Sequence, residues 1–172
     1  AYAGMRYFHP TIKEAIHDAY KDGFRRMIML PMYPQYSLAT TGSSFEVARQ
    51  VLKLFPDVES TFIRDFHDQP DYIALMQAYI NDNISPNDTL LFSAHSLPQK
   101  FVDEGDPYVD QVRRTAKLAA GNREYFVSFQ SRTGPVEWVG PDTIDETRRL
   151  LSERKGDLFV LPISFVCEHI ET

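Results

Sequence analysis

The stretch Thr89-Leu-Leu-Phe-Ser-Ala94, with His95 directly after it, decides the fold of this chain. Its residues are apolar or small almost throughout, instead of alternating between apolar and polar. Such a run is typical of a strand in a parallel sheet that is covered on both faces. Four other short runs have the same character and predict four more buried strands: Met27–Pro31, Val58–Arg64, Glu124–Gln130 and Asp157–Ile163.

Helical patterns separate these runs. From Thr11 to Asp22, apolar side chains recur at helical spacing, and Thr11 with Glu14 forms a capping box at the start. Ser43 with Glu46 offers a second capping box before another helical pattern. Three further patterns predict helices: Tyr72 to Ile80, a helix with Asp106 as its N-cap and Pro107 in its first turn, and Thr143 to Arg154.

The alternation of helix and strand is the signature of an α/β fold. We predict a doubly wound, mainly parallel sheet with helices on both faces. A length of 172 residues suits one domain, so we expect a single α/β domain over residues 1–172.

Composition narrows the class of protein. The net charge of −6 argues against a nucleic-acid partner, because phosphate binding needs clustered Lys and Arg. Cys167 is the only cysteine, so no internal disulfide can form, which fits a reducing compartment such as the cytoplasm. The apolar runs are too short to cross a bilayer, and the N-terminus lacks the apolar core of a signal peptide. The chain begins without an initiator methionine, and we interpret it as a piece of a longer cytoplasmic protein; contact with the periphery of a membrane is left open.

Unusual residues gather where the predicted strands end. Ligands of open α/β sheets bind outside the carboxyl ends of the strands. Four segments there hold the only tryptophan, two of the five histidines and several carboxylates, whereas the loops at the opposite edge are short and charged. This asymmetry indicates a functional cleft, although loops in general collect polar residues. The segments are Pro31–Ser37, Ser93–Pro98, Gln130–Pro141 and Ser164–Thr172.

Two of these segments carry side chains that suit metal or proton chemistry. His95 follows the third strand directly and could point into the cleft, or it could merely cap the next helix. Glu168-His169-Ile170-Glu171 could bind a divalent metal or relay protons, or it could be an acidic first turn at the positive end of a helix. Trp138, Tyr33 and Tyr36 add flat apolar surface that would suit a planar ligand, although ordinary packing explains each ring equally well.

At these loops the sequence resembles ferrochelatase, over almost the whole chain from Met5-Arg-Tyr7 to His169-Ile-Glu-Thr172. The matching stretches occur in the order expected of the family. They are Tyr33-Pro-Gln-Tyr-Ser37, Thr40-Thr-Gly-Ser-Ser44, Phe92-Ser-Ala-His-Ser-Leu-Pro98, Gly105-Asp-Pro-Tyr108, Gln130-Ser-Arg132, Gly134-Pro135, and Trp138 with Gly140-Pro141.

The resemblance implies an enzyme that inserts ferrous iron into protoporphyrin IX to form protohaem, the last step of haem biosynthesis. It also implies a class II chelatase-like fold, in which two similar α/β domains face each other across a porphyrin cleft. This chain would be the second, catalytic half. Its partners would then be protoporphyrin IX, ferrous iron and the missing N-terminal domain of the same protein.

Residue roles carry over from the same resemblance. His95 matches the catalytic histidine of the family and Glu171 its catalytic glutamate, and both are implicated in binding the iron. His169 matches a position that is histidine in many members, so it is a secondary candidate. The residues that match the lining of the cleft are Arg6, Tyr7, Tyr33 and Trp138.

The family pattern also bears on cofactors and on rival functions. Some relatives hold an iron–sulfur cluster through a cysteine at the position of Leu38, and Cys167 cannot replace four thiolates. We therefore expect no cluster and no tightly bound cofactor, with ferrous iron as substrate. Two alternatives remain: a chelatase for coproporphyrin or cobalt, and a haem- or metal-binding fragment without turnover.

Overall fold

A computed structural model describes residues 1–154 and 156–166. They fall into two compact units. The first comprises Ala1–Pro31 with Tyr36–Asp65, and the second comprises Met32–Gln35 with the chain from Phe66 onward.

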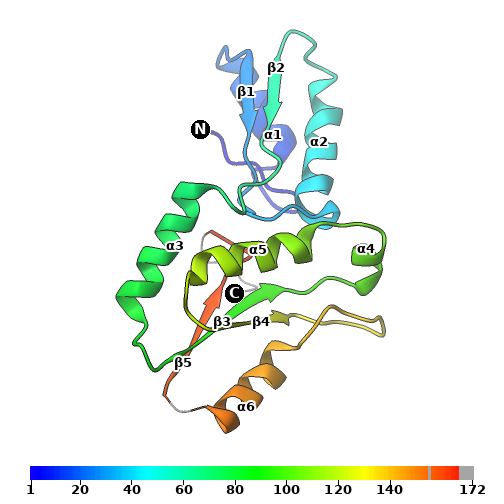
Figure 1. Ribbon diagram of the computed structural model, residues 1–172. Coiled ribbons are helices and arrows are strands. Elements are labelled where there is room, and N and C mark those ends of the chain that lie inside the picture. Colours follow the sequence, from blue (N-terminus) through cyan, green and yellow to red (C-terminus); the bar gives the residue numbers. More distant parts are fainter. Residues whose placement is uncertain (155, 167–172) are drawn as a thin grey trace. The chain divides into compact units, whose positions relative to one another are not determined.

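The second unit is built on β3 (Thr89–His95), the predicted central strand. It lies between β4 (Tyr125–Gln130) and β5 (Leu158–Pro162) and is parallel to both. Helix α5 (Tyr108–Ala120) covers one face of this sheet, and α6 (Thr143–Glu153) lies on the other (Figure 1). Helix α3 (Pro70–Asn83) packs beside α5, and the short α4 (Gln99–Asp103) follows β3.

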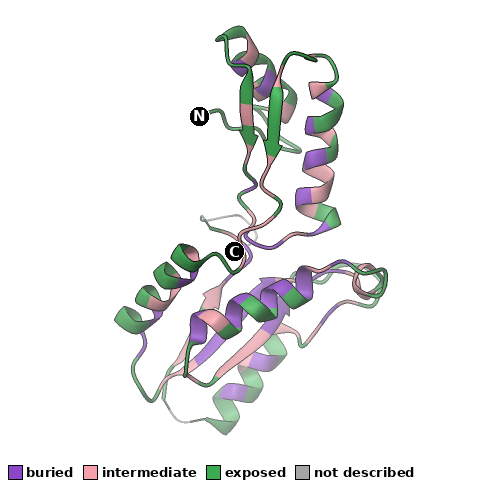
Figure 2. Ribbon diagram, turned by 45° about the horizontal axis from the view of Figure 1, so that its top comes forward, coloured by how far each residue is buried: buried purple, intermediate pink, exposed green. Residues whose placement is uncertain are grey.

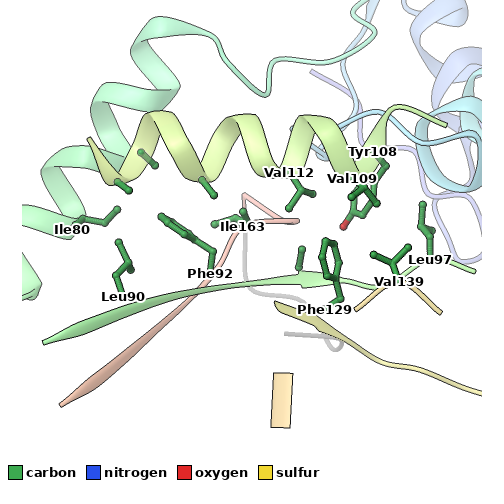
Figure 3. Close-up of a cluster of buried hydrophobic side chains, with 14 of the residues drawn as sticks. Ile80, Leu90, Phe92, Leu97, Tyr108, Val109, Val112, Phe129, Val139 and Ile163 are labelled. Carbon is green, nitrogen blue, oxygen red and sulfur yellow. The ribbon is translucent and has the colours of Figure 1, made fainter. Parts of the chain in front are cut away.

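Because β3 is pleated, alternate side chains of the strand point toward α5. Leu90, Phe92 and Ala94 face α5 and join a buried apolar cluster with residues such as Val112 and Phe129 (Figure 3). The strand and the sheet-facing side of α5 are buried along most of their length (Figure 2). The predicted class, α/β with a parallel sheet between helices, is confirmed.

The first unit contains a smaller parallel pair, β1 (Arg26–Met29) and β2 (Glu59–Phe62). Helices α1 (Ile12–Lys21) and α2 (Ser43–Leu52) pack on each other. Their shared apolar cluster has Ile16, Ala48 and Val51 at its centre, with Met27, Met29 and Phe62 packed against it.

The first residues of α1 and α2 show whether the two predicted capping boxes form. Thr11 is the N-cap of α1 and exchanges both hydrogen bonds with Glu14, so the first box is confirmed. The second is wrong. A π-helical turn, η1 (Leu38–Gly42), runs directly into α2, so Ser43 lies inside a continuous helical segment and its hydroxyl donates back to the carbonyl oxygens of Ala39 and Thr40.

Other sequence expectations also need correction. The apolar runs do not specify strand pairing, and the five strands form a two-stranded and a three-stranded sheet. Burial on both faces is confirmed for β3 but wrong for β1 and β2. Ile28 of β1 projects away from α1 and α2 and is 72% exposed, and the first three residues of β2 are exposed as well. On α3, Leu75 and Tyr79 are apolar positions of the predicted stretch Tyr72 to Ile80 but are exposed, whereas Ile73 and Ile80 are buried. The expectation of one domain over residues 1–172 stays a prediction.

Candidate functional site

Parallel pairing brings three strand ends to one edge of the second unit. His95 ends β3 and lies in register with Gln130, which ends β4. On the other side of β3, Ser93 is in register with Pro162 at the end of β5. The predicted placement of His95 beside the segments that follow β4 and β5 is therefore confirmed.

The backbone of His95 is tied to the segment after β5. Its amide N–H donates to Oγ of Ser164 over 2.9 Å. The hydroxyl of Tyr108, on the first turn of α5, lies 2.7 Å from the same Oγ. Burial raises the pKa of Tyr108 far above its ordinary value, although hydrogen bonds with Ser164 and with the His95 backbone partly oppose this shift. Tyr108 is therefore a neutral hydroxyl at any physiological pH.

A second polar cluster lies on the α6 side of β3. The hydroxyl of Ser93 donates to Oε1 of Gln130 over 3.1 Å and lies 3.1 Å from Oγ1 of Thr143. Thr143 donates in turn to Oγ of Ser128. These bonds satisfy hydroxyls that are buried in the sheet and fix the Gln130 side chain next to the end of β3.

The chain leaves β4 through an uncommon backbone conformation. Ser131 has a φ of 69°, in the left-handed region that residues other than glycine rarely adopt. Such outliers gather at functional sites, where the surrounding structure holds them. Ser131 is therefore a structural signal, additional to sequence pattern, that this edge is specialised.

The loop that carries Trp138 is joined to the segment that follows His95. The amide of Val139 donates to the carbonyl oxygen of Leu97, and the amide of Gln99 donates to that of Glu137. Within the loop, Nε1 of Trp138 donates to the carbonyl oxygen of Thr133 over 3.0 Å. Trp138 and His95 therefore belong to two neighbouring, hydrogen-bonded loops at the same edge.

Tyr33 is held near the same edge from the third side. Its ring centroid lies 5.9 Å from that of Phe165, one residue beyond Ser164. Two residues after Tyr33, the fully buried amide of Gln35 donates to Oγ1 of Thr115 and to the carbonyl oxygen of Ile163. The structure thus gathers three predicted site residues, His95, Trp138 and Tyr33, around the carboxyl ends of β3, β4 and β5.

The remaining predicted residues belong to the first unit or lie outside the described residues. Arg6 and Tyr7 lie in the first unit, where the Arg6 guanidinium is 4.8 Å from the centroid of the 83% exposed Tyr7 ring. Glu171 and His169 lie outside the described residues, as does Cys167. Among residues 1–154 and 156–166, no group of three or more His, Cys, Asp or Glu side chains could hold a metal ion. The metal-handling role of His95 and Glu171 stays a prediction.

Sequence reasoning assigned no chemistry to Ser164, Tyr108 or Gln35. All three are polar residues that are at least nine-tenths buried, and all lie next to predicted strand ends or in motif stretches. A polar residue inside or beside an apolar run is the signal that could have marked them, since buried polar groups require partners.

A model of the family Ferrochelatase matches residues 1–172. The ferrochelatase of Geotalea daltonii is 39% identical over 181 residues, which cover 100% of this chain and 57% of that protein. For the ferrochelatases of Picosynechococcus and Aquifex aeolicus, identities are 42% and 41%, with 99% and 98% of this chain and 48% and 57% of those proteins covered. The chain spans about half the length of the curated relatives it matches.

A solved structure supplies a comparison of fold alone. SirB from Bacillus subtilis with Fe3+ superposes with a TM-score of 0.62 at 14% identity, covering 90% of this chain and 59% of that one. In the part of this chain that the structure describes, no helix has both the length and the apolar character needed to span a membrane.

Proposed function

This chain belongs to the ferrochelatase family, and from that premise we propose that its protein inserts ferrous iron into protoporphyrin IX to form protohaem. Residues 1–172 would form the second catalytic half of a two-domain chelatase, completed by an N-terminal domain of the same protein. Iron is then a substrate, and no cofactor or iron–sulfur cluster resides in the enzyme. The proposed compartment is the cytoplasm.

The observation that supports this proposal most directly is the position of His95. It ends the central strand of a parallel sheet, and its backbone is held by Ser164 of the segment that leads toward Glu171. Trp138 and Tyr33 come from loops at the same edge and offer aromatic surface for a flat macrocycle. Ligands of this fold class bind at this edge.

The chemistry follows from the substrate. A free porphyrin carries two pyrrole N–H protons that must leave as the divalent ion enters. A neutral imidazole at position 95 can accept such a proton or hold the incoming ferrous ion. A carboxylate at position 171 can ligate the metal or carry protons away. Binding the macrocycle in a distorted shape would tilt its nitrogen lone pairs out of the ring plane and ease metal entry.

An insertion assay tests the proposal. The protein, expressed from its complete coding sequence, is given ferrous iron and protoporphyrin IX under anaerobic conditions, and the absorbance change of the porphyrin is followed. We expect His95→Ala and Glu171→Gln each to lower kcat by at least about 100-fold, the usual contribution of a positioned acid–base group. The matched controls His17→Ala and Glu153→Gln replace exposed side chains on α1 and α6 and should keep the parental rate.

Other outcomes would redirect the assignment. Parental rates in both site variants would remove His95 and Glu171 from the mechanism. Tight binding of haem without insertion would favour a binding module. Faster insertion into coproporphyrin, or of cobalt, would place the enzyme with a different substrate in the same chemical class.

A further inference from the structure

Strands β3 and β5 stop sharing backbone hydrogen bonds just before His95. The last bond of their ladder runs from the amide of Ile163 to the carbonyl oxygen of Ser93, over 3.0 Å. In a parallel ladder of this register, the next bond would join the amide of His95 to the carbonyl oxygen of Ile163. That bond is replaced. The His95 amide donates to the side chain of Ser164, and the Ile163 carbonyl accepts from the side chain of Gln35.

Tyr108, on the neighbouring helix α5, supports the side-chain hydrogen bond that replaces this backbone bond. Its ring is 6% exposed and belongs to the cluster between α5 and the sheet, so packing fixes its hydroxyl. Oγ of Ser164 accepts from the His95 amide and forms a second hydrogen bond, of 2.7 Å, with the Tyr108 hydroxyl. The three groups form a continuous link from the start of α5 to the end of β3.

This link lies where the backbone pairing of β3 with β5 ends. A backbone rung holds neighbouring strands about 4.8 Å apart, whereas an interposed side chain lets the two strands diverge. Divergence at this point would widen the space between His95 and the segment that follows β5. The spacing of those two chain segments then depends on two hydroxyl groups instead of on the sheet.

We propose that Ser164 and Tyr108 are positioning residues for His95. Their paired hydroxyls replace a rung of the sheet and hold the His95 backbone where its imidazole can work on the substrate. Neither hydroxyl touches the reacting atoms. The proposal rests on the proposed function, since it concerns the rate of metal insertion.

The test removes each hydroxyl separately from the protein expressed from its complete coding sequence. Tyr108→Phe keeps the packed ring, and Ser164→Ala removes the acceptor of the His95 amide. We expect kcat for iron insertion to fall about 10- to 100-fold in both, the scale on which small misplacements of catalytic groups act. The KM for porphyrin should change by less than about twofold, because ground-state binding is untouched. Ser164→Thr, which keeps a hydroxyl, should recover most of the rate.

Two controls separate positioning from general loss of a buried hydroxyl. Tyr72→Phe alters another largely buried tyrosine on a helix, and burial raises the pKa of Tyr72 to about 12. Thr41→Val removes a fully buried hydroxyl from η1 of the first unit. Neither side chain has a described hydrogen bond to His95, and both variants should keep the parental kcat.

A second readout does not depend on activity. Residue-resolved hydrogen exchange of the His95 amide should accelerate about tenfold in Ser164→Ala, the scale of one lost hydrogen bond, and stay unchanged in Thr41→Val. If His95→Ala is inactive while Tyr108→Phe and Ser164→Ala keep parental kcat, the positioning role is overturned and the proposed function survives. If the parent inserts no metal, the proposed function fails, and an unchanged His95 exchange rate in Ser164→Ala would overturn the structural link as well. Should Ser164→Ala fail to fold, the kcat of Tyr108→Phe alone decides.

Discussion

The side-chain amide of Gln35 donates a hydrogen bond to the backbone carbonyl oxygen of Ile163 over 3.1 Å, joining two positions 128 residues apart in the sequence. The same amide nitrogen lies 3.1 Å from Oγ1 of Thr115, and the Gln35 side chain is 1% exposed. This contact attaches the short segment Met32–Gln35 to the core of the second unit. The position of Tyr33 at the site edge depends on it.

Replacing Gln35 by Leu should therefore lower stability more than a typical substitution. The apolar side chain leaves the Ile163 carbonyl and the Thr115 hydroxyl with one partner fewer in the buried core. We expect the free energy of unfolding to fall by about 2–4 kcal/mol, as for other buried hydrogen-bonded groups that lose a partner. Urea denaturation of both proteins measures the difference.

The matched control for this variant is Gln50→Leu. Gln50 is an exposed residue on α2 whose amide bonds to the neighbouring side chains of Glu46 and Lys53, so its loss should change stability by less than about 0.5 kcal/mol. Equal effects of the two substitutions would contradict an anchoring role for Gln35.

Two glycines with a positive φ angle give a second prediction. Gly23 has a φ of +90° and open space where a Cβ would lie, whereas at Gly156, with φ +95°, a Cβ would collide with the carbonyl oxygen of Asn87. Gly23→Ala should cost about 1–2 kcal/mol, the strain of a left-handed alanine. Gly156→Ala should cost at least about 3 kcal/mol, because the backbone must also move. Thermal unfolding compares the two, and equal shifts in Tm would show that the Asn87 contact relaxes without cost.

Helix α1 provides a prediction on pH. The backbone amide of Thr11, followed by the side chain of His9, lowers the pKa of Glu14 to about 2. Since the folded-state pKa lies below the ordinary value of 4.5, ionised Glu14 stabilises the folded chain fully above that pH. The contribution is lost as the pH falls from 4.5 toward 2.

Carboxyl-carbon NMR titration of the folded protein should place the Glu14 midpoint near 2. His9→Gln should raise the midpoint, because one of the groups that favour the carboxylate is removed. The free energy of unfolding should also decline less steeply with acid in Glu14→Gln. A midpoint of 4.5 in the parent would mean that the capping box does not persist in solution.

Local pattern was sufficient for part of this structure and insufficient for the rest. The apolar run of β3 and the Thr11–Glu14 box depend on neighbours in sequence, and both were predicted. So was the place of His95 at the end of its strand. The contact from His95 to Ser164 joins residues 69 positions apart. A periodic pattern of apolar residues in the sequence cannot predict such a pairing. The Ser43 cap failed for a different, local reason, because the preceding π-helical turn supplies the start of α2.

Porphyrin binding through Trp138 gives the last prediction. The indole nitrogen is bound to the carbonyl oxygen of Thr133, which holds the ring within its loop beside the segment after His95. If the macrocycle stacks at this edge, Trp138→Ala should raise the Kd for protoporphyrin IX about tenfold, on the scale of an aromatic pair, and Trp138→Phe should raise it less than about threefold. A titration followed by porphyrin absorbance measures both. Tyr79→Ala, which removes a 51% exposed ring from α3, serves as the aromatic control and should leave the Kd unchanged. A parental Kd in Trp138→Ala would locate the macrocycle away from this loop, even if His95 proved essential for insertion.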